Sequence, residues 1–274
     1  MTSAVRLEGT ALHAGSRVVV TLACEPGPIR WEQRGRDAPL DAFVVTRADR
    51  GVTIAATVAG GRIVVDLVEH LLAALAGLGV RDGVRIVTDD QELPLLDGGA
   101  RRFALALLAI DAPRGSAPSL EVARAATFTH GGSSYRFEPA DAMSVDVAID
   151  FPAPVGRQRA RWDGDPGDFL ARIAPARTFG WESEAEALRA GGRAAAVDLE
   201  SVVVFGAHGS VLGGAPPGPD EPARHKLLDL IGDLALHGGP PRGSVTAVRP
   251  GHTATHAVIT QALAAGVLVA PEGS

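Results

Sequence analysis

The stretch Val68-Glu-His-Leu-Leu-Ala-Ala-Leu-Ala-Gly-Leu-Gly79 predicts a helix, because leucines recur at three- and four-residue steps from position 71 to position 78. Gly79 stands where the C-terminus of a helix favours glycine. Segments typical of strands flank this helix at Arg62–Asp66, which follows a Gly-Gly turn, and at Val84–Thr88. Short strands and helices mix irregularly in both directions from here, which favours an α+β fold over a parallel doubly wound sheet.

The hydrophobic pattern predicts further elements along the chain. The expected strands are Val18–Ala23, Phe43–Thr46, Ser134–Glu138, Met143–Ile149, Val202–Phe205 and Ser244–Val248. The expected helices are Arg101–Ile110, Pro166–Arg172, Glu182–Ala190, Arg224–Leu236 and Thr255–Ala265. A Gly/Pro-rich surface loop is expected at Gly213–Pro222. The Pro/Gly/Ser-rich segment 111–119 predicts a boundary between two domains, residues 1–112 and 119–274.

Composition excludes several classes of protein. The chain has 274 residues, of which 46% are hydrophobic, so it can build a core and is not disordered. Its formal net charge of −6 argues against a general nucleic-acid binder. A single cysteine, Cys24, excludes a disulfide framework and a cysteine-rich zinc site. Neither a secretory signal nor an apolar stretch long enough to span a bilayer is present, so we expect a soluble, cytoplasmic protein.

A weak internal echo links two of the expected helices. Leucines lie two and five residues after His70 and a glycine lies seven residues after it, and the same offsets hold from His225. Four matching positions in a sequence rich in Leu and Gly can arise by chance. The echo is therefore only a hint of duplication.

The clearest chemical signal is Arg224-His225-Lys226-Leu-Leu-Asp229-Leu-Ile-Gly-Asp233. His225 and Asp229 are four residues apart, so on a helix their side chains share a face and can converge on one ion. Asp233 is one turn further along and can orient a ligand or a catalytic group. A solvated polar helix face shows the same spacing. Lys226 is also the only lysine in the chain.

Two further histidines extend this signal. Glu69 precedes His70 at the start of an otherwise apolar helix, and His252 follows a strand and a glycine turn in Arg249-Pro-Gly-His. Alternatively, Glu69 is a first-turn residue that favours the helix dipole, and His70 is a partly buried histidine. His252 is then an ordinary solvated histidine of a loop. Together, two histidines and a carboxylate make the ligand set of a catalytic zinc site, and Glu69 and His252 remain as base and acid. His13 lies in a turn-like setting, Leu12-His-Ala-Gly15. The other histidines have no recognisable ligand spacing and are assigned to surface or packing: His130, His208, His237 and His256.

Several motifs, in order along nearly the whole chain, resemble the zinc-dependent UDP-3-O-acyl-N-acetylglucosamine deacetylases of lipid A biosynthesis. They are Leu12-His-Ala-Gly15, Val68-Glu-His-Leu through Gly79, Glu92-Leu-Pro-Leu-Leu-Asp-Gly98, Ala176-Arg-Thr-Phe-Gly180, Arg224-His-Lys-Leu-Leu-Asp-Leu-Ile-Gly-Asp-Leu234 and Gly251-His252. The resemblance implies two similar layered α+β domains with the active site between them. The first domain then supplies Glu69 and His70, and the second supplies Thr178, His225, Asp229 and His252.

The resemblance also implies chemical roles. Zinc is expected on His70, His225 and Asp229, with Fe²⁺ as the alternative metal because His and Asp accept either. Glu69 is the expected general base, and His252, oriented by Asp233, the acid that protonates the leaving amine. The Thr178 hydroxyl is expected to stabilise the oxyanion.

The implied substrate is an acylated UDP-sugar. Lys226 and Arg249 are expected to contact its anionic groups, Phe179 and Trp181 to line the sugar site, and Phe151 to stack on uracil. The expected protein is a monomer with no nucleic-acid partner, and transient contact with membrane lipid is compatible with an acylated substrate.

Several parts of the chain depart from the family pattern, among them Pro250, which replaces a Ser before Gly251. Ala194–Leu199, with Val197, replaces a small Gly-rich stretch near the acyl tunnel; Glu184 replaces a more usual Asp; and the residues after His252 lack an Asn. These departures leave two alternatives to the deacetylase. One is a zinc amidohydrolase acting on another N-acetylated sugar nucleotide. The other is a non-catalytic zinc-binding paralogue.

Overall fold

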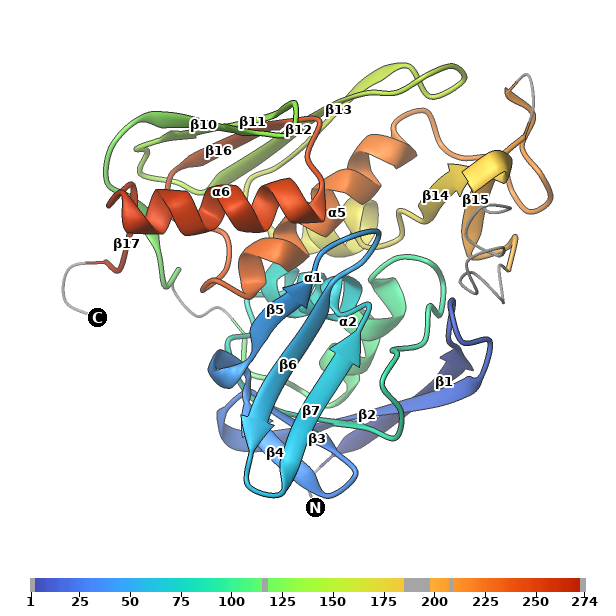
Figure 1. Cartoon of the computed structure of the whole chain (residues 1–274), viewed down its shortest axis with the longest axis vertical. Helices are drawn as coiled ribbons and strands as arrows, with labels where there is room; N and C mark the ends of the chain where they lie inside the picture. The colour runs from blue at the N-terminus through green and yellow to red at the C-terminus, as the bar shows by residue number, and fades with distance from the viewer. Residues whose placement is uncertain (1–2, 115–117, 185–197, 207–208, 272–274) are drawn as a thin grey trace.

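Two five-stranded sheets form the outer layers of the molecule, and the long helices lie between them (Figure 1). The structure is a computed structural model that describes residues 3–114, 118–184, 198–206 and 209–271. Its helices are α1 (Glu69–Gly77), α2 (Arg101–Ala109), the short α3 (Pro166–Asp168), α5 (Glu221–Ala235) and α6 (His252–Ala264). A 3-10 turn spans Leu40–Ala42, and a π-helical turn spans Phe169–Ile173.

The two outer sheets have the same strand order. The first, in spatial order, is β1 (Ala4–Thr10), β2 (Arg17–Pro28), β8 (Asp82–Thr88), β3 (Arg30–Gln33) and β4 (Arg36–Pro39). The second is β10 (Ala126–His130), β11 (Ser133–Glu138), β16 (Ser244–Val248), β12 (Ser144–Asp150) and β13 (Arg157–Trp162). In the first sheet, β8 runs antiparallel to β2 and parallel to β3. In the second sheet, β16 likewise runs antiparallel to β11 and parallel to β12. In both sheets this central strand is the last one in the sequence. One helix precedes that last strand and another follows it, so the two halves are similar layered α+β units, as predicted.

Each half also carries an insertion between its fourth strand and its first long helix. In the first half it is a three-stranded antiparallel sheet of β5 (Val44–Arg47), β6 (Thr53–Val58) and β7 (Gly61–Asp66). In the second half it contains the parallel pair β14 (Thr178–Trp181) and β15 (Val202–Phe205). A short antiparallel pair, β9 (Glu121–Val122) and β17 (Leu268–Val269), lies near the C-terminus.

The two glycines of the internal echo lie where the halves meet. A Cβ on Gly232 of α5 would lie 2.1 Å from the backbone oxygen of Glu69, so only glycine lets α5 approach α1 this closely. A Cβ on Gly77 of α1 would lie 2.4 Å from the ring of Phe169 in the second half. One hydrophobic core therefore runs through both halves, with Trp31 and Trp162 buried in it.

The predicted elements are confirmed for the described residues, with differences at their ends. Helix α6 begins at His252 rather than at position 255, because the extended Gly251 caps it and accepts the first helical N–H from Thr255 at 2.8 Å. Helix α5 begins at Glu221, which shortens the predicted loop. The predicted helix at 166–172 forms with Asp165 as its cap, and then becomes π-helical.

Some predictions stay untested. Most of the predicted helix at 182–190, His208 and all but the end of the stretch 194–199 lie outside the described residues. The boundary between 112 and 119 also stays a prediction, although every sheet takes its strands from one side of it. No helix in the described part of the chain is long and apolar enough to cross a membrane.

Candidate active site

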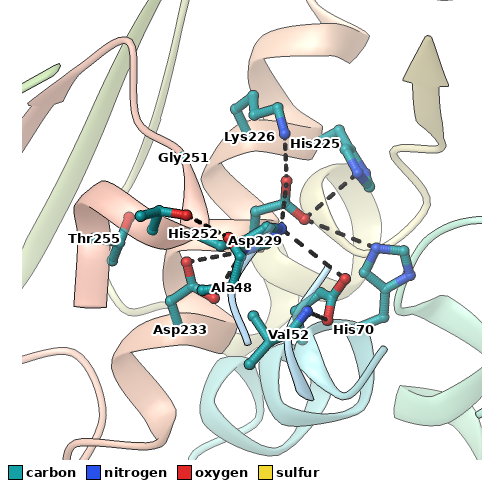
Figure 2. A network of polar contacts seen from close by, with 12 residues as sticks. Ala48, Val52, His70, His225, Lys226, Asp229, Asp233, Gly251, His252 and Thr255 are labelled. Atoms are coloured by element: carbon teal, nitrogen blue, oxygen red, sulfur yellow. Dashed lines mark hydrogen bonds and ion pairs between the residues drawn. The ribbon is translucent and has the colours of Figure 1, made fainter. Parts of the chain in front are cut away.

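Three buried side chains from the two central helices converge at the junction of the halves. His70 of α1 and His225 and Asp229 of α5 place their ligand atoms within 4.8 Å of one another (Figure 2). The Oδ1 atom of Asp229 lies 3.8 Å from Nε2 of His70 and 3.5 Å from Nε2 of His225. The other oxygen, Oδ2, accepts a hydrogen bond of 2.8 Å from Lys226. One carboxylate oxygen therefore faces both imidazoles while the other is already held.

The distances from Oδ1 of Asp229 to the two imidazole nitrogens suit three ligands of a tetrahedrally coordinated ion. Two ligand atoms at 2.0–2.1 Å from such an ion lie about 3.4 Å apart. His225 donates from Nδ1 to the carbonyl oxygen of Ala176 at 3.0 Å, which leaves the lone pair of Nε2 toward Asp229. Burial lowers the pKa of His225, and burial, with a smaller contribution from the neighbouring His225, lowers the pKa of His70 to about 3. Both rings are therefore neutral at pH 7, which is the form that binds a metal.

Asp229 is ionised in this setting. Burial works against its charged form, but His225, Lys226 and His252 together hold the pKa of its carboxyl well below the usual range. Two neutral imidazoles and one carboxylate are a donor set for Zn²⁺ or Fe²⁺, and three protein ligands leave a further coordination position open.

Glu69 lies beside this group at the start of α1. Its Oε2 atom accepts a hydrogen bond of 3.0 Å from the backbone of Val52, and its Oε1 atom lies 4.0 Å from Nε2 of His252. Burial raises the pKa of Glu69. A Cβ on Gly51, at a φ of +131°, would lie 3.3 Å from Oε1 and 2.4 Å from Leu67, so glycine is needed for this loop to approach the carboxylate.

His252 faces the same space from the N-terminus of α6. Its Nδ1 donates to both oxygens of the buried Asp233, at 2.9 and 3.0 Å, and its Nε2 lies 3.9 Å from Oδ2 of Asp229 (Figure 2). Burial alone lowers the pKa of His252, but Asp233, Asp229 and Glu69 raise it to about 10. A protonated imidazole and a carboxylate of raised pKa thus face each other across the site, the pairing expected of an acid and a base.

A cavity of about 280 Å³ opens onto these groups. Its lining includes Thr178, Phe179 and Trp181 from the β14 segment, and Phe151 from the end of β12. Phe151 packs against Phe179 and Trp181, with ring centroids 5.4 Å apart in both cases. Lys226 also lines the cavity, with its Nζ 5.8 Å from the centroid of the Phe179 ring. The structure thus brings these predicted substrate contacts together, and their roles stay predictions.

Arg249 lies apart from this cavity. It lines a second, open hollow together with Asp150, Arg157 and Arg159. This hollow lies where the end of β12, the start of β13 and the end of β16 are neighbours in the sheet. Its predicted contact with the diphosphate stays untested, since that hollow and the cavity are separate among the described residues.

Sequence reasoning missed several residues that line the cavity. Arg50 forms an ion pair of 3.1 Å with Glu184 between the two halves, and no local pattern marks Arg50. His13 also lines the cavity, in a turn whose backbone N–H groups donate to Glu92 at 2.7 and 3.0 Å. The motifs at 12–15 and 92–98, far apart in sequence, are therefore parts of one structure.

The chain is similar to known proteins along almost its whole length. A family model described as LpxC, UDP-3-O-acyl N-acetylglycosamine deacetylase, matches residues 1–264. A UDP-3-O-acyl-N-acetylglucosamine deacetylase of Myxococcus xanthus (strain DK1622) is 34% identical over 94% of this chain and 83% of its own length. Proteins of the same name from Anaeromyxobacter sp. (strain Fw109-5) and Solibacter usitatus (strain Ellin6076) are 36% and 32% identical, over 95% and 93% of this chain and 86% and 87% of their own lengths. The match over almost the whole chain, together with the geometry of the site, establishes that this chain belongs to the UDP-3-O-acyl-N-acetylglucosamine deacetylase family.

Proposed function

We propose that this chain hydrolyses the N-acetyl group of UDP-3-O-(3-hydroxyacyl)-N-acetylglucosamine and releases acetate, a step of lipid A biosynthesis. The observation that carries the proposal is the convergence of His70, His225 and Asp229 with Glu69 and His252 at one cavity. A binding protein has no need of an acid and a base on opposite sides of a metal ligand set, so this arrangement favours catalysis.

His70, His225 and Asp229 would hold the metal, Zn²⁺ or alternatively Fe²⁺. A bound divalent ion supplies a Lewis acid that lowers the pKa of water and polarises a carbonyl oxygen. Glu69 would take a proton from the water that attacks the acetamide carbon. The C–N bond then breaks, and His252, held by Asp233, gives its proton from Nε2 to the leaving amine. The Thr178 hydroxyl is available to donate to the oxyanion.

The rest of the cavity supports an acylated UDP-sugar. Leu95, Val202 and Val204 form an apolar cluster at its wall, which suits an acyl chain better than solvent does. Phe179 and Trp181 would line the sugar, and Phe151 would stack on uracil. Lys226 and Arg249 would contact the anionic groups of the substrate. Lys226 lies beside the proposed metal ligands, and Arg249 lies in the hollow at the end of β12.

The experiment is acetate release by the zinc-loaded protein from UDP-3-O-(3-hydroxyacyl)-N-acetylglucosamine across a series of acyl lengths. We expect release with a clear length optimum and only weak competition by UDP-N-acetylglucosamine. Equal turnover of the acylated and non-acylated sugars would favour an amidohydrolase for another N-acetylated sugar nucleotide. Zinc binding with no turnover of either would favour the non-catalytic paralogue.

A further inference from the structure

A second pair of histidines lies behind the catalytic candidate His252, on the far side of Asp233. His256 is one turn beyond His252 on α6, and His237 is four residues beyond Asp233, in the turn that follows the end of α5 at Ala235. Helices α5 and α6 pack against each other, and the rings of His237 and His256 lie with their centroids 5.2 Å apart. Asp233 is buried with 1% of its surface exposed, and His256 is buried with 8%. The mechanism described above uses neither His237 nor His256.

The contacts form a continuous chain. Nε2 of His237 lies 2.9 Å from Nδ1 of His256, a hydrogen-bond distance. Nε2 of His256 lies 3.5 Å from Oδ1 of Asp233, the same oxygen that accepts from Nδ1 of His252 at 2.9 Å. Nε2 of His256 is buried and makes no hydrogen bond of ordinary geometry with any of the described residues. A buried polar atom of this kind costs free energy unless a partner satisfies it, and Asp233 is placed to do so.

The protons can be assigned from this chain. An ionised Asp233 only accepts, so the imidazole nitrogen that faces it carries a proton. If Nε2 of His256 is protonated, its Nδ1 holds a lone pair and accepts from Nε2–H of His237. Burial, and next the neighbouring His256, lower the pKa of His237 to about 4, which keeps that ring neutral at pH 7 as the assignment needs. His256 then holds the Asp233 carboxylate from the side opposite His252.

We propose that His256, locked in one tautomer by His237, is a positioning residue that fixes the Asp233 carboxylate toward His252. This inference rests on the proposed function, because it acts through the group that protonates the leaving amine. Loss of the Nε2–H of His256 would let Asp233 turn away from Nδ1 of His252, and the imidazole would lose its orientation. Substrate binding, which uses the cavity walls, would be unaffected.

The test compares two replacements of His256 in the zinc-loaded protein. Leu keeps apolar volume but has no donor, whereas Gln places an amide N–H near the position of Nε2. We expect His256→Leu to lower kcat about 10-fold with KM within about twofold of wild type, and His256→Gln to recover most of that loss. A packing role would give the reverse, with Leu the better replacement, and would overturn the proposal. His130→Gln, at an exposed histidine of β10, is the matched control and should leave kcat unchanged.

A second measurement does not depend on turnover. The ¹⁵N chemical shifts of the imidazoles report which nitrogen carries the proton. We expect His256 to be protonated at Nε2 in the wild-type protein, and to become a mixture of tautomers in His237→Leu. Protonation of His256 at Nδ1 in the wild-type protein would overturn the proposal. If the wild-type protein releases no acetate, the proposed function fails while this measurement still decides the tautomer.

Discussion

The two oxygens of Glu69 have different tasks. Oε2 is held by the backbone N–H of Val52, while Oε1 points toward Nε2 of His252 and the cavity. The Glu69 carboxylate forms no ion pair with the candidate ligands His70 and His225, so the base can be changed without changing the ligand set.

Glu69→Gln should therefore keep the metal and lose turnover. The amide has the size of the carboxylate but cannot take a proton, and we expect kcat to fall about 100- to 10,000-fold. Metal content measured by elemental analysis should stay at the wild-type level. Glu138→Gln, on the outer sheet, is the control. Undiminished acetate release by Glu69→Gln would refute the assignment of Glu69 as base.

His237 predicts a dependence of stability on pH. Its pKa is about 4 in the folded protein, below the value of about 6.5 in an unfolded chain. The unfolded state therefore binds more protons between these values, so the stability that His237 contributes is present above pH 6.5 and is lost as the pH falls toward 4. At pH 5 the loss is at most about 2 kcal/mol.

Urea unfolding at pH 7.5 and pH 5 measures this difference. The free energy of unfolding of the wild-type protein should fall more between the two pH values than that of His237→Gln, and comparing the two proteins cancels the other titrating groups. His130→Gln should behave as the wild type does. An equal fall in wild type and His237→Gln would show that His237 is not the group responsible.

Among the individual site residues, those that lie inside long motifs could be predicted from the sequence. The spacing of His225, Asp229 and Asp233 predicted a shared helix face, which the structure confirms. His237 and His256 were assigned to surface or packing because each was considered alone. Their four-residue spacings from Asp233 and His252 were present in the sequence, but the crossing of α5 and α6 that makes the two pairs meet was not.

The crossing of helices α1 and α5 positions the candidate metal ligands His70, His225 and Asp229. Gly232 makes it possible, since a Cβ there would lie 2.1 Å from the Glu69 carbonyl oxygen and 2.9 Å from the carbon. The atoms in the way are backbone, which cannot rotate aside as a side chain can. A larger residue must therefore push the helices apart.

Gly232→Ala should weaken both stability and metal binding. We expect overpacking to cost about 1–3 kcal/mol of unfolding free energy. The affinity for Zn²⁺ should also fall, because His70 moves away from His225 and Asp229. Gly77→Ala, whose Cβ would meet the Phe169 ring rather than α5, is the matched control. It should lose stability with little change in Zn²⁺ affinity, measured by competition with a chelator, and equal loss of affinity in both variants would contradict the argument.

Among the elements, apolar and β-branched segments were predicted well and charged ones were not. β13 reads Arg-Gln-Arg-Ala-Arg-Trp, β3 reads Arg-Trp-Glu-Gln and β4 reads Arg-Asp-Ala-Pro, so none has a clear hydrophobic pattern. They form strands because neighbouring strands hold them, and ion pairs such as Arg30 with Asp37 lie on their exposed faces. The start of α6 was missed for a related reason. His-Thr-Ala-Thr has weak helix propensity, and the cap at Gly251 compensates for it.

For the whole molecule, the repeated strand order explains the internal echo. Both halves place a helix before the last strand of the sheet, and these helices, α1 and α5, pack against each other between the sheets (Figure 1). A match of four positions could not establish this from sequence alone. The evidence for two similar halves is the strand order, which includes pairs distant in sequence such as β2 with β8. Local sequence patterns do not encode such contacts.

Because the ligands come from both halves, the metal should also hold the halves together. His70 belongs to the first half, and His225 and Asp229 to the second, so a bound ion adds a link across the helix layer. A ligand that binds only the folded state stabilises it by an amount that grows with its concentration, about 4 kcal/mol at 1,000 times Kd. Removing the metal with a chelator should therefore lower the Tm by several degrees, and adding Zn²⁺ back should restore it. Asp229→Ala, which leaves two histidines, should show a much smaller response to Zn²⁺. A Tm that is the same with and without Zn²⁺ in the wild-type protein would mean that the ion does not bridge the halves.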